Sequence, residues 1–338
     1  MQKKVFEKLL MILAIALFLA GCNYKPASFG DFQKIIVYAD STIYKKIQTE
    51  LEQTFDQFVY TPHIERSFYL DLQPFHTLNT YQTRRNILFI GLLDGEDEVS
   101  SFINSALSAQ VKQSISNGRV FEIFQKDIFA TEQIVMFFPG THVDSIKKNL
   151  SNRKDIIFNK LDRLYFERLE NAMFLKGEQI AIEEYLAEKY GWKIRIQHDY
   201  ELVNESDEGN FVWMRRLNPD RSLFVYRFSD QNFDENGDWI YDLRDSLTTV
   251  YYEADSILKE DTYLRYIKFQ GKNAIKLAGV WQNHKHLIGG PFSTYAFHDT
   301  TNNYTYMIDL TVTAPGQLKK NLLDQLEVMA HSFKLIGN

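Results

Sequence analysis

The single cysteine of the chain, Cys22, sets the first limit on how this sequence can fold. A chain with one cysteine cannot form an intrachain disulfide bond, so its folded state has to rest on a hydrophobic core. At 338 residues it is long enough, because a chain of about 300 residues buries about 75% of the surface that it exposes when unfolded. Hydrophobic residues make up 45% of the chain and charged residues 24%, a composition typical of a globular protein.

The position of Cys22 predicts a lipid anchor. Three lysines lie within the first eight residues, residues 9–20 are apolar, and Leu19-Ala20-Gly21-Cys22 follows. This is the layout of a bacterial lipoprotein signal peptide over residues 1–21, with cleavage before Cys22 and diacylglycerol on its sulfur. Two or three acyl chains on this residue anchor a protein stably. The alternatives are an ordinary secretory peptide with a chance cysteine, or an uncleaved N-terminal anchor.

Acylation of Cys22 also limits the chemistry of the mature chain. It leaves no free thiol, which excludes a cysteine nucleophile, zinc–thiolate sites and iron–sulfur ligation. Residues 22–33 are predicted to be a tether. Residues 23–30 contain no acidic residue, which favours the periplasmic face of the outer membrane over the inner membrane or the cell surface.

Net charge and aromatic content indicate which classes of partner the chain can bind. The net charge of −6 and the absence of a polybasic stripe disfavour a nucleic-acid partner. The chain has 19 tyrosines and 26 phenylalanines, which favour strands and aromatic core packing; ligand grooves are the less common use of such residues.

The first half of the chain, residues 34–175, is predicted to be an α/β domain. Strands are expected over 35–38, 86–93 and 134–138, the last stopped by Pro139-Gly140. Asp40-Ser41 is expected to cap a helix whose apolar face runs from Ile43 to Phe58. Another helix is expected over 99–107, after the acidic run 94–98, and a long one from Ile157 to Phe174.

The second half, residues 176–338, is predicted to be α+β, with the boundary at 175–177. A short helix over 178–190 leads into strands near 192–196, 211–214, 223–228, 275–281 and 304–312. A helix is expected over 239–250. Ala314-Pro315-Gly316 turns the chain into a closing helix, whose core face is expected to comprise Leu318, Leu322, Leu326, Met329 and Phe333. The fold class is therefore α+β with two α/β halves, the second a mostly antiparallel sheet packed by amphipathic helices.

Two segments partly imitate metal sites. Residues 232–237 place oxygen ligands and a glycine as a calcium loop does, but Leu243 stands where such a loop needs a bidentate glutamate. A polar turn, with Asp238 capping the next helix, is the favoured interpretation. His284 and His286 are two residues apart, with only His298 as a distant third ligand, which favours a polar hairpin loop beside Gly289-Gly290-Pro291. We therefore predict no metal site and no cofactor.

No enzyme signature is found in the sequence. The chain has no nucleophile elbow, phosphate-binding loop, dinucleotide-binding turn, β-lactamase motif or zinc-protease helix. The pair Arg244-Asp245 is interpreted as a structural ion pair or solvated face rather than a substrate contact. A pair of catalytic carboxylates stays possible, because such a pair is recognised in space and not in sequence.

Five short motifs in the second half resemble those of one family: Tyr190-Gly191-Trp192-Lys193-Ile194, Phe211-Val212-Trp213, Leu243-Arg244-Asp245-Ser246, Gly289-Gly290-Pro291-Phe292 and Ala314-Pro315-Gly316. In these motifs the chain resembles the Bacteroidetes lipoproteins grouped as domain of unknown function 4837. The residues around Cys22 and the strand near Ile35 are also similar, so the resemblance extends over most of the mature chain. It implies a bacterial cell-envelope lipoprotein without an assigned activity, and it transfers no functional residue except Cys22. The order of elements is also similar to the PsbP-like layout, an analogy that concerns the fold alone.

The sequence leads to three hypotheses. The first is a non-enzymatic lipoprotein, anchored in the membrane through Cys22, that binds an envelope protein or glycan. The alternative is a glycan-directed envelope hydrolase whose carboxylates meet only in the folded chain. The third is a structural or assembly factor of the envelope.

Overall fold

The computed structural model describes residues 25–59, 61, 63–206, 208, 210–229, 236–251 and 255–336, so Cys22 and the predicted signal peptide lie outside the described residues. The chain forms two compact units. The first comprises residues up to Thr54 together with Phe68–Lys154, and the second comprises Phe55–Ser67 and Asp155 onward. The long helix α6 (Val143–Phe174) contributes to both, whereas the boundary predicted from sequence falls just after its end.

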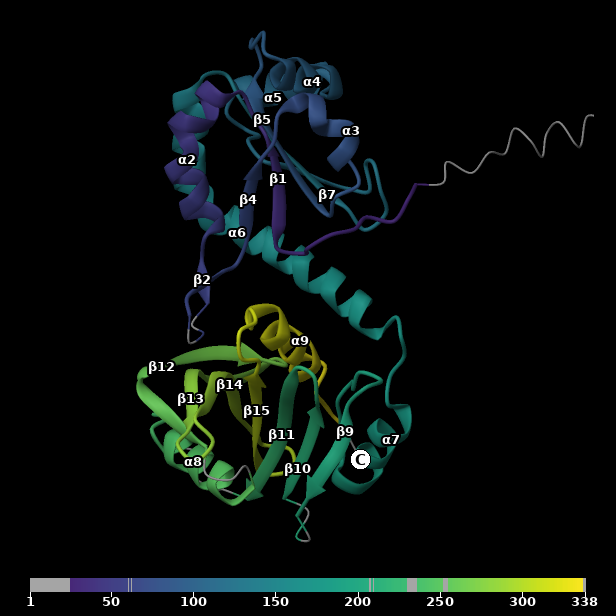
Figure 1. Cartoon of the computed structure of the whole chain (residues 1–338), viewed down its shortest axis with the longest axis vertical. Helices are drawn as coiled ribbons and strands as arrows, with labels where there is room; N and C mark the ends of the chain where they lie inside the picture. The colour runs from purple at the N-terminus through teal and green to yellow at the C-terminus, as the bar shows by residue number, and fades with distance from the viewer. Residues whose placement is uncertain are drawn as a thin grey trace, which may run out of the picture. The chain divides into compact units, whose positions relative to one another are not determined.

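The first unit is built on a five-stranded sheet (Figure 1). Its order is β4 (Tyr69–Leu72), β1 (Lys34–Tyr38), β5 (Asn86–Leu92), β7 (Ile134–Gly140) and β6 (Ile123–Lys126). The first four strands are parallel, and β6 is antiparallel to β7. The strands predicted over 35–38, 86–93 and 134–138 are confirmed, but β7 runs through Pro139-Gly140 instead of stopping before it.

Helices cover both faces of this sheet. Ile36, Phe89 and Phe137 point to the face packed by α4 (Glu98–Ala106), while α2 (Ser41–Phe55) and α6 lie on the other side (Figure 1). Shorter helices are η1 (Phe75–Thr77), α3 (Leu78–Tyr81) and α5 (Ala109–Ser116). The predicted N-terminal cap of α2 is confirmed, since the Asp40 carboxylate accepts the amide of Thr42 at 2.8 Å. However, α2 ends at Phe55, and Phe58 lies in β2 (Phe58–Val59) instead of on the helix.

Residues expected to form a free tether are bound to the first unit. The Ser28 amide donates to the Thr131 carbonyl at 3.0 Å, and the Phe29 amide donates to the Thr83 carbonyl at 3.1 Å. The guanidinium of Arg84 lies 4.3 Å from the centre of the Phe29 ring. The chain is therefore attached to the first unit well before residue 33, where the predicted tether ends.

The second unit is built on a seven-stranded antiparallel sheet, which confirms the predicted α+β fold class. Its order is β12 (Ser256–Phe269), β13 (Lys272–Asn283), β14 (Ile288–Asp299), β15 (Tyr304–Thr313), β11 (Asp220–Ser229), β10 (Phe211–Arg216) and β9 (Glu201–Glu205). Sequence analysis did not predict β14. Helices cover both of its faces, so nearly all its residues are buried and the apolar–polar alternation that marks a half-exposed strand is missing.

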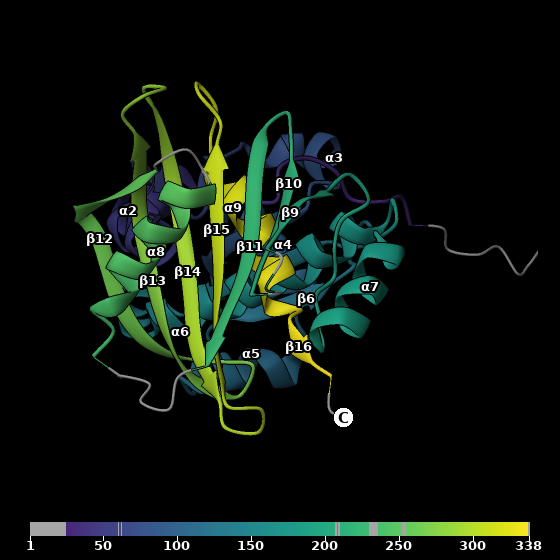
Figure 2. The same cartoon turned by 90° about the horizontal axis from the view of Figure 1, so that it is seen from below.

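Two helices enclose this sheet (Figure 2). Helix α8 (Trp239–Tyr251) packs on one face, against a core that includes Phe224, Leu277 and Met307. Helix α9 (Lys320–His331) packs on the other face. Because α9 begins at Lys320, Leu318 precedes the helix and is 61% exposed, so its predicted place in the core was wrong.

The remaining elements complete the second unit. They are α7 (Ile180–Tyr190) and the small pairs β2 with β3 (Glu65–Arg66) and β8 (Trp192–Lys193) with β16 (Lys334–Leu335). Within the ranges described above, no helix is both long and apolar enough to cross a membrane.

Candidate binding site in the second unit

A cavity of about 310 Å³ opens on the face of the seven-stranded sheet that carries α8. We call it the α8 pocket. Its size falls at the lower end of small-molecule sites, which span roughly 300–1,000 Å³. It is lined by Trp213, Arg215, Asp220, Ser222, Tyr251, Asp255, Trp281, Asn283, His286, Ile288, Thr311 and Thr313.

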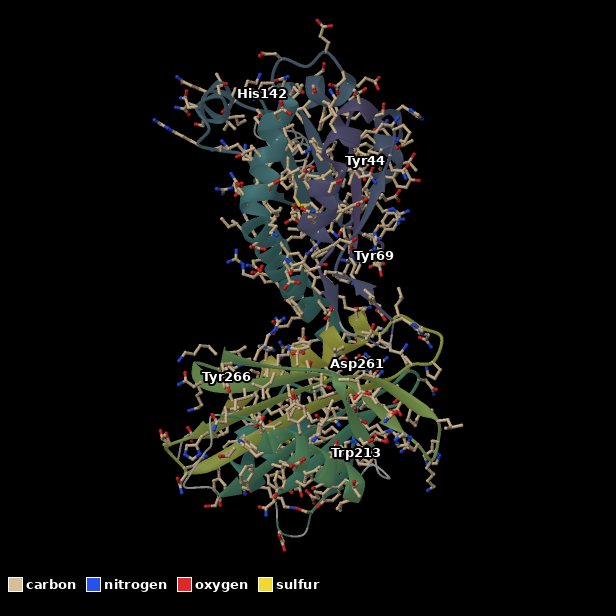
Figure 3. The ribbon with its side chains drawn as sticks, turned by 90° about the vertical axis from the view of Figure 1, so that its left-hand side faces the viewer. Tyr44, Tyr69, His142, Trp213, Asp261 and Tyr266 are labelled. Atoms are coloured by element: carbon tan, nitrogen blue, oxygen red, sulfur yellow. The ribbon has the colours of Figure 1, made fainter. Side chains whose placement is uncertain are left out.

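Strand alternation brings most of these side chains to one face. Side chains two residues apart on a strand point the same way. Four strands each supply such a pair, namely Trp213 and Arg215, Asp220 and Ser222, Trp281 and Asn283, and Thr311 and Thr313. Figure 3 labels Trp213 on β10 among the strands of this unit.

Asp255 and Asn283 form the polar centre of the α8 pocket. The Asn283 amide donates to Asp255 Oδ1 at 2.7 Å, and both residues are buried. The Asn283 side-chain oxygen accepts the backbone amides of Lys285 at 3.0 Å and His286 at 2.9 Å. The Thr248 hydroxyl donates to the Asp255 carbonyl at 2.6 Å. This acid–amide pair is therefore held rigidly between the end of α8 and the β13–β14 turn.

Aromatic and basic groups form the sides of the pocket. The Arg215 guanidinium lies 5.6 Å from the centre of the Trp213 ring and binds both oxygens of Asp220, at 2.8 and 2.6 Å. The Tyr251 ring stacks on Phe211 at 3.8 Å. Aromatic rings with fixed polar neighbours suit a ligand that has both apolar faces and hydroxyl groups.

Trp281 brings an unused donor to this site. It is 3% exposed, and its indole N–H is buried without a hydrogen-bond partner among the described residues. A buried N–H group in a native structure normally has a partner, and a bound ligand or water is a common explanation where the protein supplies none. Gly290 adjoins this nitrogen, and the Val312 carbonyl lies so close to Gly290 that no larger residue fits.

The surroundings of Asp255 raise the pKa of its carboxyl group. Burial raises its pKa from 3.8 to about 6, against the hydrogen bond from Asn283 and the charge of Arg244, which lower it. The charges of Asp309 and Asp220 raise it further. Asp255 is thus an acid that changes its charge just below neutral pH.

A larger cavity, of about 750 Å³, lies on the opposite face of the sheet between α9 and the second part of α6. Its central charges satisfy one another. Lys276 donates to Glu327 at 2.8 Å and to the Tyr295 hydroxyl at 2.7 Å, and the Tyr295 hydroxyl donates to the other Glu327 oxygen. Burial acts to raise the pKa of Glu327, but the charges of Lys276 and His331 and the hydrogen bonds from Lys276 and Tyr295 together hold that pKa below its ordinary value. This network joins the sheet to α9, and both Glu327 oxygens accept hydrogen bonds from within the protein.

A cavity of about 760 Å³ on the same face is also internally paired. Lys272 binds Asp299 at 2.5 Å, and Arg227 donates to the Tyr190 carbonyl at 2.7 Å. The guanidinium of Arg227 lies 5.0 Å from the centre of the Tyr304 ring. Lys272 and Arg227 are therefore held by contacts inside the protein, although Arg227 Nε is buried without a hydrogen-bond partner among the described residues.

The first unit has a crevice of about 500 Å³ at the carboxyl ends of β1 and β4, beside the start of α4, the helix that follows β5. Ligands of open α/β sheets bind at such a position, where neighbouring strands connect in opposite directions. Here the carboxylates cap helices: Asp40 accepts the amides at the start of α2, and Asp97 accepts the Ser100 amide at 2.9 Å and its hydroxyl at 2.5 Å. The α8 pocket differs from this crevice in holding the Trp281 indole N–H, which has no hydrogen-bond partner among the described residues.

The Arg244-Asp245 motif stabilises the fold of the second unit. Arg244 is fully buried and binds Asp309 of β15 at 2.8 Å, with Phe292 beneath its guanidinium at 4.2 Å. Asp245 accepts the Ile257 amide at 3.0 Å, which ties β12 to α8. The interpretation as a structural ion pair is confirmed, and the close partner of Arg244 is Asp309 at 2.8 Å, whereas Asp245 lies 4.0 Å from it.

Of the two segments that imitate metal sites, the first lies partly outside the described residues and the second lies in a turn. Residues 232–235 lie outside the described residues, while Leu243 lies on α8 and packs against the core. His284 and His286 lie in the predicted hairpin turn between β13 and β14, and His298 lies toward the far end of β14 beside Thr305. Over the described part of the chain, no three histidine, cysteine or acidic side chains gather as metal ligands do.

The sequence analysis did not predict the α8 pocket, although two of its features are visible in the sequence. All four tryptophans lie in the second half, and Trp213 with Arg215 and Trp281 with Asn283 follow the period of a strand. The pairing of Asp255 with Asn283 joins residues 28 positions apart and has no local signal. It was missed for that reason.

Comparison with known proteins adds little about activity. No curated protein matches the sequence. Similar solved structures include a mutant of the protein Mog1, at 10% identity over 44% of this chain and 92% of that one, with a TM-score of 0.30. Another is the Ran-binding protein Mog1p of Saccharomyces cerevisiae, at 10% identity over 43% and 90%, with a TM-score of 0.31. LpqN of Mycobacterium tuberculosis, described as involved in cell envelope biogenesis, is 11% identical over 43% and 83%, with a TM-score of 0.29.

Family models correct the extent of the resemblance drawn from sequence motifs. The sequence motifs predict that the resemblance to domain of unknown function 4837 covers most of the mature chain. The model of that family matches only the second half. Two families of unknown function divide the chain: residues 28–174 match the model described as Domain of unknown function (DUF8532), and residues 179–332 match the model described as Domain of unknown function (DUF4837).

Proposed function

We propose that the protein is a non-enzymatic cell-envelope lipoprotein that binds a saccharide in the α8 pocket. One observation carries the ligand class: two indole rings and the buried Asp255–Asn283 pair line one small cavity, where the Trp281 N–H has no partner among the described residues. Indole faces suit the C–H faces of a sugar ring, and an acid–amide pair suits its hydroxyl groups.

The location in the envelope rests on the sequence around Cys22. We infer a Bacteroidetes lipoprotein, acylated at Cys22 and held at the periplasmic face of the outer membrane. With Cys22→Ser, a palmitate analogue should no longer label the protein, and the protein should leave its membrane fraction. Labelling that persists in Cys22→Ser would overturn the anchor.

Saccharide binding is tested with the full chain in detergent micelles. A glycan array identifies candidate sugars, and calorimetry then measures their affinity. Replacing Trp213 by alanine removes one stacking surface and should weaken binding at least tenfold, which corresponds to about 1.4 kcal/mol. Trp239→Ala is the matched control, because Trp239 is partly buried on α8 and does not line the pocket. Equal affinities for the two variants, or no bound sugar at all, would contradict the proposal.

A second candidate function is glycoside hydrolysis in the same pocket. The observation that favours it is that Asp255, with its raised pKa, shares the cavity with a second carboxylate, Asp220. Hydrolysis would need one to protonate the leaving oxygen and the other to activate water. Against it, Arg215 holds both oxygens of Asp220.

Asp255→Asn separates the two functions. In a binding module, this variant should keep measurable affinity, and neither it nor the wild type should release reducing ends from envelope glycans. Release of reducing ends by the wild type, lost in Asp255→Asn, would establish the hydrolase instead.

A further inference from the structure

Four exposed apolar side chains either line the α8 pocket or are close in sequence to residues that line it. Leu217 is 61% exposed, Val250 72%, Leu287 89% and Ile288 38%. Leu217 lies in the β10–β11 turn between Arg215 and Asp220, Val250 precedes Tyr251, and Leu287 lies between His286 and Ile288, so each is close in sequence to a lining residue. We call these four residues the apolar rim. Single exposed leucines are ordinary, but a group at the mouth of one cavity indicates contact with an apolar partner.

Leu287 also has a strained backbone conformation. Its φ is 52°, the left-handed conformation that glycine and asparagine adopt far more readily than a bulky residue. Its side chain is almost fully exposed, so the leucine gains no burial inside the protein in return. A residue that strains the backbone without packing within the fold is expected to act outside it.

The apolar rim and the α8 pocket share one residue. Ile288 both belongs to the rim and lines the cavity beside Trp281 and Asn283. A ligand that fills both regions must therefore have a hydroxyl-rich part, which meets the acid–amide pair, joined directly to an apolar part.

We propose that the α8 pocket takes the sugar headgroup of a glycolipid that remains in the membrane, with the apolar rim inserted among its acyl chains. This inference rests on the proposed saccharide function and specifies its ligand. A free, fully hydrophilic glycan would make no use of the rim. Burial of leucine and isoleucine side chains at the lipid interface adds to the binding free energy in proportion to the apolar area removed from water.

The test uses the mature chain, residues 22–338, with Cys22→Ser, which retains every described residue and removes the apolar leader and the acyl anchor. Phosphatidylethanolamine vesicles carry lipid-linked glucose in one arm and lipid-linked N-acetylglucosamine in another. The matching methyl glycosides are measured free in solution. For the sugar that binds, we expect vesicle flotation to give an apparent affinity at least tenfold tighter than that of the free glycoside.

The decisive variant is Leu217→Ser/Leu287→Asn. It should lose the tenfold gain on vesicles and bind the free glycoside within twofold of the parent. Its thermal midpoint should not fall, because asparagine relieves the left-handed strain at position 287. Leu175→Ser/Ile336→Ser is the matched control, since these exposed residues do not line the pocket or adjoin a lining residue, and it should keep the gain.

The outcomes separate this inference from the function on which it rests. Equal affinity for vesicle-borne and free sugar, or full vesicle affinity in Leu217→Ser/Leu287→Asn, overturns the glycolipid inference while saccharide binding stands. Binding of neither free nor vesicle-borne sugar overturns both.

Discussion

Individual buried charges in the second unit are neutralised by residues from distant parts of the chain. Arg244 on α8 and Asp309 on β15 are both fully buried, and the Thr294 hydroxyl from β14 donates to the same carboxylate at 2.5 Å. Burial raises the pKa of Asp309, while Arg244 and Thr294 act in the opposite direction. The pair joins the helix to the centre of the sheet, so each charge depends on the other.

Removing one member of this pair should be far more costly than removing a surface charge. Arg244→Met leaves Asp309 buried without its cation, and we expect a loss of about 3–5 kcal/mol in the free energy of unfolding, measured by urea denaturation. Arg244→Met/Asp309→Leu should recover much of it. Lys259→Met is the control, because Lys259 and Asp242 pair at 3.7 Å on the surface and should contribute less than about 1 kcal/mol. Similar losses in both single variants would contradict this account.

Asp162 on α6 should make stability depend on pH. Burial raises its pKa from 3.8 to about 6; the charge of Lys320 lowers it, and that of Asp324 raises it. The folded state therefore binds this proton more tightly than the unfolded state. The free energy of unfolding should fall as pH rises from about 4 to about 6 and stay lower above that window.

Asp162→Asn should remove this dependence. At pH 7 we expect the variant to be about 1–2 kcal/mol more stable than the wild type, less than the full shift implies because water screens the half-buried carboxylate. The difference should vanish below about pH 4. Denaturation from pH 4 to 8 measures it, with the exposed Asp155→Asn on the same helix as control. A stability difference between the wild type and Asp162→Asn that does not change with pH would reject this assignment.

At the scale of elements, helix α9 has no N-terminal cap from its own residues. Lys319 precedes the helix and offers no side-chain cap. The carboxylate of Glu65, from β3, instead accepts the Lys319 amide at 2.8 and 3.0 Å and the Lys320 amide at 2.8 Å. A residue more than 250 positions away thus satisfies the free amides at the start of the closing helix.

Loss of this remote cap should destabilise α9 specifically. Glu65→Ala should lower the free energy of unfolding by about 1–2 kcal/mol, and Glu65→Gln by less, because its amide oxygen still accepts. Amide exchange in the first turn of α9 should accelerate in the alanine variant. Glu260→Ala, an exposed position on β12, should change neither measurement. Unchanged exchange in Glu65→Ala would show that the cap is dispensable.

At the scale of the whole molecule, the second unit includes part of α6. Leu161, Leu169 and Met173 are buried, and the Tyr165 hydroxyl donates to Asp324 of α9 at 2.6 Å. A cut at the predicted boundary would leave these residues with the N-terminal fragment. The second unit therefore requires chain from before that boundary.

Fragments test this requirement. The fragment 176–338 should expose the apolar surface that α6 covers, bind a hydrophobic dye and unfold without cooperativity. The fragment 155–338 restores that cover and should unfold cooperatively, though less stably than the intact chain because it lacks Glu65. Urea denaturation and the binding of a hydrophobic dye are measured for both fragments and for the intact chain. Cooperative, intact-like unfolding of 176–338 would refute the role of α6.

Elements with a local signature were predictable. In α2, Ile43, Ile47 and Leu51 repeat at helical spacing behind a capping aspartate, and β15 alternates over its whole length. The start of α6 was placed too late, at Ile157, because its first turns carry few apolar residues. Leu318 was assigned to α9 because its spacing fits the helix, although the helix begins two residues later.

By itself the sequence determined the fold class, half of the described strands, most of the described helices, and the expectation of a lipid anchor at Cys22. These depend on interactions between residues close in the chain, or on a short processing signal. Only the tertiary structure decided where Asp255, Asn283, Trp213 and Trp281 meet, and that Arg244 pairs with Asp309. The reason is physical: a pocket or a buried ion pair joins side chains from strands that are adjacent in the sheet but far apart in sequence, and no local periodicity records that adjacency.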